Sequence, residues 1–157
     1  MPAWYDITGR DSNDREDFSG IHKSALAISE LIEREASRGV AYRKIVLAGF
    51  SQGCAMSLQV GLRFPHALAG IMALSGYLPL AKSLPLERSE ANSKTPIFMA
   101  HGVWDAVITL ERAEASSDTL QKLGYQVDWN SYPMEHSLHP DELVDISRFL
   151  TMVLSKS

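Results

Sequence analysis

The chain alternates between short apolar runs and longer amphipathic segments, and this alternation limits its fold more than any other feature. Four apolar runs are too short for typical helices and are predicted to be strands: 44–50, 69–76, 96–100 and 126–132. Four segments with apolar residues at helical spacing are predicted to be helices: 19–37, 52–63, 109–123 and 141–154. Because strands that alternate with helices run parallel, the pattern predicts an α/β fold, with a parallel sheet of about four core strands and flanking helices.

The remaining segments are predicted to be irregular. Residues 1–20 are polar and rich in Asp, Gly and Ser, which favours a loop. Residues 79–95 are polar and contain prolines, which favours a surface excursion with a turn of helix. The run 44–50 is almost continuously apolar, which is typical of a strand buried on both faces of a sheet. No repeat or low-complexity linker divides the chain, so we expect one domain over residues 1–157.

Composition excludes several classes of protein. Hydrophobic residues make up 45% of the 157 residues and charged residues 22%, as in a globular domain with a core. The 15 Lys and Arg and 19 Asp and Glu are mixed without a basic run, so no nucleic-acid-binding surface is expected. A single cysteine forms neither an intrachain disulfide nor a multi-cysteine metal centre. No apolar run approaches the ~20 residues that span a bilayer, and residues 1–6 lack the features of a signal peptide. We therefore expect a cytoplasmic protein.

The turn after the first predicted strand has the sequence Gly49-Phe50-Ser51-Gln52-Gly53, a G-x-S-x-G pentapeptide. Between a strand and a helix, this pentapeptide holds a serine hydroxyl above the sheet on a turn too sharp for larger neighbouring side chains. The N–H of Gln52 then points to where an oxyanion forms. An ordinary tight turn is the alternative, because glycine and serine are common in turns. The position between strand and helix favours a nucleophilic Ser51.

Two further strand ends supply the partners that a serine nucleophile needs. A serine hydroxyl requires a base, and the base requires an acid that fixes its tautomer. With this type of turn, the chain order is serine, acid, histidine. Asp105 follows the third predicted strand and His136 follows the fourth. Since functional groups gather at the carboxyl ends of parallel strands, the sequence predicts a triad of Ser51, Asp105 and His136.

Other candidates are less suited to these roles. His139 is predicted to be a surface residue at a helix start, and it would form a metal pair with His136 only on one helix, so no metal site is expected. His101 precedes Asp105 in the chain and is predicted to support its loop. Cys54 lies one turn into the following helix, where a small residue packs against the sheet. Neither G-x-G-x-x-G nor a Walker motif occurs, which argues against nucleotide binding.

Three large apolar residues near the predicted triad are candidates for an acyl-binding pocket. They are Trp4, Leu78 and Trp104. Core packing is the alternative for each, because large apolar side chains are most often buried.

Five segments resemble the phospholipase/carboxylesterase family of α/β-hydrolases, which includes the acyl-protein thioesterases. These are residues 1–7, 45–55, 74–79, 101–108 and 132–137, with the motifs MPAWYDI, GFSQG, LSGYLP, HGxxDxVI and YPMxHS. The resemblance implies Ser51 as nucleophile, Asp105 as acid and His136 as base. It also implies short-chain carboxylic esters or acyl thioesters as substrates, and no cofactor. Cys54 stands where many members of the family have glycine.

The resemblance also implies one difference from the family. Its members have additional strands before the Trp-Tyr-Asp segment, and one of these ends in a His-Gly loop whose backbone donates a second hydrogen bond to the oxyanion. The chain begins after that loop, so we expect the C-terminal two-thirds or more of a hydrolase domain. The strand before Ser51 would then lie at a sheet edge. Because an apolar edge tends to recruit another chain, a homodimer or higher oligomer is expected.

Two functions are open on these observations. One is a serine carboxylesterase that works through an acyl-enzyme intermediate, which the complete triad favours. The other is a catalytically weak remnant of a hydrolase fold that acts as a binding or interaction module, which the missing loop favours. An acyltransferase with the same triad would differ from the first only in the acceptor that replaces water.

Overall fold

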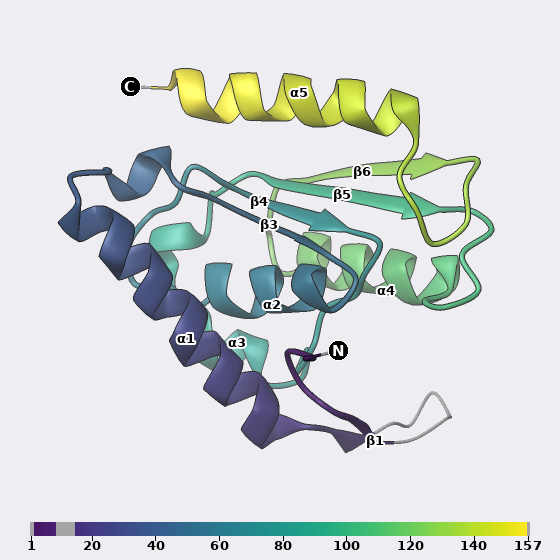
Figure 1. The fold of residues 1–157 in the computed structure, drawn as a ribbon, viewed down its shortest axis with the longest axis horizontal. Helices are drawn as coiled ribbons and strands as arrows, with labels where there is room; N and C mark the ends of the chain where they lie inside the picture. The colour runs from purple at the N-terminus through teal and green to yellow at the C-terminus, as the bar shows by residue number, and fades with distance from the viewer. Residues whose placement is uncertain (1, 9–14, 157) are drawn as a thin grey trace.

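The computed structural model describes residues 2–8 and 15–156, and a parallel sheet of four strands forms its centre (Figure 1). The strands are β3 (Val46–Phe50), β4 (Gly70–Leu74), β5 (Ile97–Gly102) and β6 (Val127–Tyr132). Their order in the sheet, β3-β4-β5-β6, repeats their order in the chain. The prediction of an α/β fold with a parallel sheet is confirmed, and the four carboxyl ends lie at the same end of the sheet.

Helices cover both faces of this sheet (Figure 1). α2 (Gln52–Gly61) and α4 (Leu110–Lys122) lie on one face, and α5 (Pro140–Ser155) lies on the other. α1 (Phe18–Ser37) packs against α2. The four predicted helices are therefore present, with small differences at their ends. None of the helices in the described ranges is both long enough and apolar enough to cross a membrane.

Local sequence signals explain where these helices begin and end. Asp17 Oδ1 accepts a hydrogen bond of 2.8 Å from the N–H of Gly20 in the first turn of α1, and the Thr109 side chain caps α4 in the same way. Gly39 and Gly124 follow the last turns of α1 and α4 with φ angles of 96° and 91°. Glycine adopts this left-handed conformation without steric cost, so both positions end a helix.

The segments predicted to be irregular contain more structure than expected. β1 (Ile7–Thr8) pairs antiparallel with β2 (Arg15–Glu16), and the Tyr5 side chain is buried in the core. The prediction that residues 1–20 form a loop is therefore wrong for these parts. The turn of helix predicted within the surface excursion 79–95 is present as α3 (Leu84–Glu87), and the 3-10 helix η2 (Glu90–Asn92) is additional. A further 3-10 helix, η1 (Tyr42–Lys44), occupies the predicted start of the first core strand.

The two central strands, β4 and β5, are buried on both faces. Side chains alternate along each strand, so neighbouring residues pack against opposite helices. One face contributes Ile71, Ala73, Ile97 and Met99 to a cluster with Leu58 of α2 and Leu120 of α4. The other contributes Met72, Phe98 and Ala100 to a cluster with Phe149 and Val153 of α5. The prediction of buried parallel strands is confirmed for these two.

β3 lies at the edge of the described sheet and is more exposed than its apolar sequence suggests. Its only partner strand among the described residues is β4. Ala48 and Phe50 are exposed, and the other three residues of the strand are half-buried. The prediction that the run 44–50 is buried on both faces is wrong, because the burial of a strand depends on its neighbours as well as on its own side chains. The edge position agrees with the expectation drawn from the family resemblance.

Candidate active site

The carboxyl ends of β3, β5 and β6 bring the predicted site residues together. Ser51 directly follows β3, Asp105 lies in the loop between β5 and α4, and His136 lies in the loop between β6 and α5. Parallel strands place these loops side by side at one end of the sheet. The three side chains therefore meet although 85 residues separate the first from the last.

Ser51 lies on a strained turn between β3 and α2. Its φ and ψ are 58° and −118°, and a positive φ is uncommon for a residue other than glycine. Gly49 is required beside it, since a Cβ there would lie 1.9 Å from the backbone oxygen of Gly53. The Ser51 N–H donates a 2.9 Å hydrogen bond to the carbonyl of Leu74 on β4. The turn is thus fixed by its neighbours and holds the serine at the end of the sheet, as the pentapeptide predicts.

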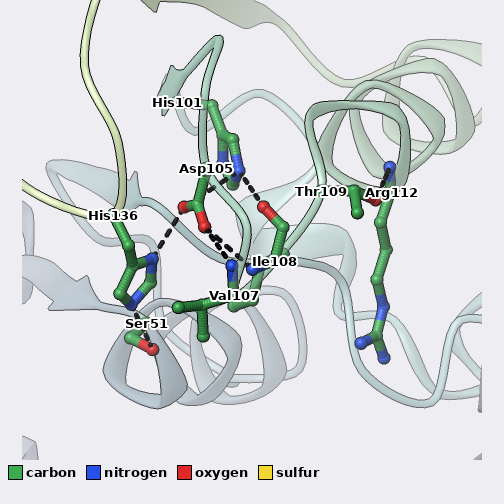
Figure 2. A network of polar contacts seen from close by, with 8 residues as sticks. All are labelled: Ser51, His101, Asp105, Val107, Ile108, Thr109, Arg112 and His136. Atoms are coloured by element: carbon green, nitrogen blue, oxygen red, sulfur yellow. Dashed lines mark hydrogen bonds and ion pairs between the residues drawn. The ribbon is translucent and has the colours of Figure 1, made fainter.

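The three side chains form a continuous chain of hydrogen bonds (Figure 2). Ser51 Oγ lies 3.1 Å from His136 Nε2, and His136 Nδ1 lies 2.7 Å from Asp105 Oδ2. The His136 side chain is 18% exposed, whereas that of Asp105 is fully enclosed. One imidazole therefore links a hydroxyl, which solvent reaches, to a buried carboxylate.

The Asp105 carboxylate is held by several hydrogen bonds besides that to His136. Its Oδ1 accepts from the N–H groups of Val107 and Ile108, each at 2.9 Å. Burial raises the pKa of the Asp105 carboxyl. The hydrogen bonds from His136, Ile108 and Val107 together lower it by more than burial raises it, so the pKa lies below its ordinary value. Asp105 is thus an ionised group in a fixed orientation, which suits it to orient an imidazole.

His101 contacts the same loop through its imidazole. It is 1% exposed, and its Nε2 lies 2.7 Å from the carbonyl oxygen of Ile108 and 3.4 Å from Asp105 Oδ2 (Figure 2). A carbonyl only accepts, so Nε2 carries the proton and donates to Ile108. The prediction that His101 supports this loop agrees with these contacts.

The loops that carry Asp105 and His136 are also joined through their backbones. The N–H groups of Val103 and Trp104 donate to the carbonyls of Tyr132 and Met134, at 3.0 and 3.1 Å. At Gly102 a Cβ would lie 2.3 Å from the Met134 carbonyl oxygen, so only glycine allows this close approach. Asp105 and His136 therefore lie in loops that form one rigid unit.

An aromatic contact that sequence reasoning missed holds the other side of His136. The rings of Phe50 and His136 lie 4.8 Å apart between centroids, with their planes at 48°. Phe50 ends β3 and is 40% exposed. The signal in the sequence was its place immediately before Ser51, but nothing in the sequence indicates which side of the strand faces the histidine.

The first turn of α2 supplies a donor close to Ser51. Gln52 is the first residue of this ten-residue helix, and its N–H is among those that a helix leaves without an internal partner. No side chain caps this helix, and the positive end of the helix dipole favours a negative charge there. This location agrees with the donor role predicted for Gln52.

The three predicted pocket residues occupy different environments. Trp4 is 43% exposed and lies near the first turn of α2, with its Nε1 4.0 Å from the position of a Cβ on Gly53. Trp104 is 63% exposed on the loop that carries Asp105. Leu78 is buried in the core cluster that contains Cys54. Trp4 alone of the three is thus an exposed side chain next to the turn that carries the serine.

The competing candidates have structural roles. His139 is the N-cap of α5: its Nδ1 accepts from the N–H of Asp141 at 3.2 Å, and Glu142 completes a capping box. It is half-buried and not a simple surface residue, in contrast to the prediction. Cys54 is buried, and burial raises the pKa of its thiol to about 12. A buried, protonated thiol is a poor nucleophile.

A cavity of about 470 Å³ lies at the amino end of the sheet, away from these residues. It is lined in part by Arg43, Lys94 and Lys156. Ser51, Asp105 and His136 are not among its lining residues, so the cavity is separate from the candidate active site.

Comparison with known proteins identifies relatives along the whole chain. A family model described as phospholipase/carboxylesterase matches residues 1–154. The chain is 41% identical to acyl-protein thioesterase 1 of Gibberella zeae over 158 residues, which cover 96% of this chain and 67% of that protein. It is 32% identical to a probable carboxylesterase of Oryza sativa subsp. japonica, over 100% of this chain and 60% of that protein. The chain thus spans about two thirds of the length of these curated relatives, or less.

Solved structures give the same result for the fold. The crystal structure of Arabidopsis thaliana SOBER1 superposes with a TM-score of 0.92 at 27% identity, over 99% of this chain and 75% of that chain. Acyl-protein thioesterase 2 of Zea mays superposes with a TM-score of 0.85 at 27% identity, over 98% of this chain and 73% of that chain. The region that the family model matches includes Ser51, Asp105 and His136. The chain therefore belongs to the phospholipase/carboxylesterase family of α/β-hydrolases.

Proposed function

We propose that the chain is a serine carboxylesterase that hydrolyses short-chain carboxylic esters or acyl thioesters through an acyl-enzyme. One observation carries this proposal: the hydrogen-bond chain from Ser51 Oγ through His136 to Asp105, at the turn before α2. Membership of a hydrolase family supports it. We expect the protein to act in the cytoplasm, where a free thiol such as that of Cys54 stays reduced.

In the first half of the proposed reaction, Ser51 Oγ attacks the acyl carbon while its proton passes to His136 Nε2. The ionised Asp105 accepts from His136 Nδ1 and stabilises the imidazolium that forms. The Gln52 N–H donates to the oxyanion of the tetrahedral intermediate. When the intermediate collapses, the bond from the acyl carbon to the leaving oxygen or sulfur breaks, and His136 Nε2 returns the proton to the departing alcohol or thiol.

In the second half, water takes the place of the alcohol or thiol. His136 Nε2 accepts a proton from this water as its oxygen attacks the acyl carbon of the ester on Ser51. Collapse of the second tetrahedral intermediate releases the carboxylic acid, and the proton returns from His136 to Ser51 Oγ. An acceptor alcohol that outcompetes water would make the same site an acyltransferase.

Hydrolysis of p-nitrophenyl butyrate and of butyrylthiocholine by the purified chain tests the proposal. The wild type is compared with Ser51→Ala and with Ser147→Ala, a control on an exposed position of α5, and all three are checked for native circular dichroism. Turnover in the wild type and the control, with none above background in Ser51→Ala, supports Ser51 as nucleophile. Equal turnover in wild type and Ser51→Ala contradicts it.

The same experiment distinguishes the second candidate function. If the wild type is folded but inert on both substrates, and a fluorophosphonate probe leaves Ser51 unlabelled, the site does not activate its serine. The chain would then act as a binding or interaction module, for which the exposed edge of β3 is the observation in favour.

We propose in addition that a second copy of the chain covers the edge of β3. An edge strand with exposed apolar residues such as Ala48 is a template for pairing with another strand. Sedimentation should show a dimer or higher oligomer at micromolar concentration, and Ala48→Lys should shift it toward the monomer because a charge on an edge strand opposes pairing. A wild-type protein that is only monomeric contradicts the proposal.

A further inference from the structure

The side chain of Gln52 makes a pair of hydrogen bonds that the proposed reaction does not use. Its Oε1 accepts from the Trp4 N–H at 3.1 Å, and its Nε2 donates to the Tyr5 carbonyl at 3.0 Å. Both partners are backbone groups of consecutive residues, 48 and 47 positions away in the chain. The carboxamide thus binds the N-terminal segment to the turn that carries Ser51.

The other hydrogen bonds of this segment are made to α1, to its cap and to the segment after β4. The Trp4 carbonyl accepts from the Ser24 hydroxyl, and the Asp6 N–H donates to Asp17 Oδ2 at 3.0 Å, so both bonds lead to α1 or its cap. The buried Tyr5 hydroxyl pairs with that of Tyr77. Among these hydrogen bonds, those of Gln52 are the ones made to the residue that directly follows Ser51.

Trp4 is the residue whose position depends on this link. Its indole lies over the first turn of α2, with Nε1 4.0 Å from the place of a Cβ on Gly53, and the residue is 43% exposed. An exposed indole beside a nucleophile offers a rigid apolar surface to an alkyl chain. Each methylene of an acyl chain that lies on this surface adds apolar contact, whereas an acetyl has only a single methyl group to place there.

We propose that Gln52 is a positioning residue that, through its side chain, holds the Trp4 indole as one wall of the acyl-binding surface, and that this wall extends the proposed short-chain specificity to acyl chains longer than acetyl. The inference rests on the proposed esterase function. Gln52 would then have two roles. Its backbone N–H donates to the oxyanion, and its side-chain carboxamide holds the segment that carries Trp4.

Kinetics on two p-nitrophenyl esters, the acetate and the octanoate, test this inference with Gln52→Met, Trp4→Ala, the double variant and the control Gln126→Met. Methionine keeps the length of the side chain but forms neither hydrogen bond. We expect the octanoate-to-acetate ratio of kcat/KM to fall about tenfold in Gln52→Met, the scale expected when the two anchoring hydrogen bonds are lost, mainly through KM for the octanoate. Trp4→Ala should lower the ratio similarly, and the double variant should lower it no further, because the two residues act as a unit. Gln126, exposed at the start of β6, should leave the ratio unchanged.

Equal losses on both esters in Gln52→Met, or an unchanged ratio, overturn the inference. A second measurement does not depend on turnover and separates this failure from failure of the proposed function. With Trp104 and Trp129 replaced by Phe, Trp4 is the one remaining tryptophan, and Gln52→Met should shift its fluorescence to longer wavelength and increase its quenching by acrylamide. If the emission is unchanged, the carboxamide does not position Trp4, whether or not the chain hydrolyses esters.

Discussion

The Nε2 atom of His101 lies between two oxygens of the acid loop, 2.7 Å from the carbonyl of Ile108 and 3.4 Å from Asp105 Oδ2. His101 is part of β5 and is almost completely buried, so its ring is fixed by the core of the sheet. The loop that orients Asp105 is thereby tied to β5, a strand that is buried along its whole length. Through these two contacts, His101 helps to fix the orientation of the Asp105 carboxylate.

We expect His101→Ala to reduce both stability and turnover. The variant leaves the buried carbonyl of Ile108 without its donor, which costs about 1–3 kcal/mol in the free energy of unfolding. It also loosens the loop, so kcat on p-nitrophenyl butyrate should fall roughly tenfold or more, the effect of small misplacements in catalytic groups. Urea denaturation and steady-state kinetics measure the two effects. His101→Gln, whose amide reaches the same carbonyl, should recover part of both, and equal losses in the two variants would contradict this explanation.

We expect Phe50→Ala to lower activity more than it lowers the stability of the fold. The variant removes the ring that lies against His136, an aromatic contact of about 0.5–1.5 kcal/mol, so the imidazole gains freedom and kcat should fall roughly tenfold. The loss of stability should stay modest because Phe50 is 40% exposed. Phe18→Ala is the control, since Phe18 is 60% exposed on α1. Similar activity of the two variants in the butyrate assay would show that the contact with His136 is not used.

Gly102→Ala should separate the acid loop from the base loop. The added Cβ would lie 2.3 Å from backbone oxygens of both Met134 and Glu135, a distance that forces one of the loops to move. Because Asp105 and His136 lie in these two loops, we expect a loss of turnover of at least about 10²-fold, as for other displacements of catalytic groups. Val103→Ala, at the exposed neighbouring position, should retain nearly full activity. A Gly102→Ala protein as active as this control would contradict the rigid coupling of the loops.

The burial of Glu142 predicts a pH dependence of stability. Burial raises the pKa of this carboxyl, and the hydrogen bond from the His139 N–H opposes the rise only in part. A carboxyl whose folded pKa lies above its unfolded value of about 4.3 holds its proton longer in the folded state. Its ionisation therefore costs stability as pH rises through the interval between the two pKa values, and below the unfolded pKa the cost is absent.

The variant Glu142→Gln should remove that cost while keeping an acceptor for the His139 N–H. The free energy of unfolding of the variant minus that of the wild type should be larger, and the variant relatively more stable, at pH 7 than at pH 4. A difference between the two proteins that does not depend on pH leaves this comparison unaffected. Urea denaturation at both pH values measures this change. A difference between the proteins that is independent of pH, or that reverses in sign, would contradict the assignment.

Much of the fold could be predicted because the two central strands are buried on both sides. Each then needs an unbroken apolar run, which is visible in the sequence whatever the neighbours are. The same argument fails for β3, where a run of the same kind ends in an exposed Phe50. The apolar sequence of a strand shows that the strand can be buried. Whether a neighbouring strand or helix actually covers it depends on the rest of the fold.

The candidate site shows the same division. Ser51, Asp105 and His136 could be placed together because parallel strands bring their carboxyl ends to one side. The contacts that hold these residues in place could not be predicted. Phe50 packs against His136, and Gln52 binds Trp4, although the partners are far apart in the sequence, and local sequence patterns do not predict such long-range contacts. His139 could only be located near a helix start, whereas its use of Nδ1 as a cap depends on the ring orientation.

The order of the strands in the sheet, β3-β4-β5-β6, is also their order of synthesis. Each strand can add to a partner that has already left the ribosome, and no later strand has to insert between earlier ones. The serine turn is completed with the first pair of strands, the carboxylate arrives with the third, and the imidazole follows only with the fourth. In a nascent or partly unfolded chain, Ser51 therefore lacks its hydrogen bond to His136, and the proposed triad is complete only after the last strand has added to the sheet.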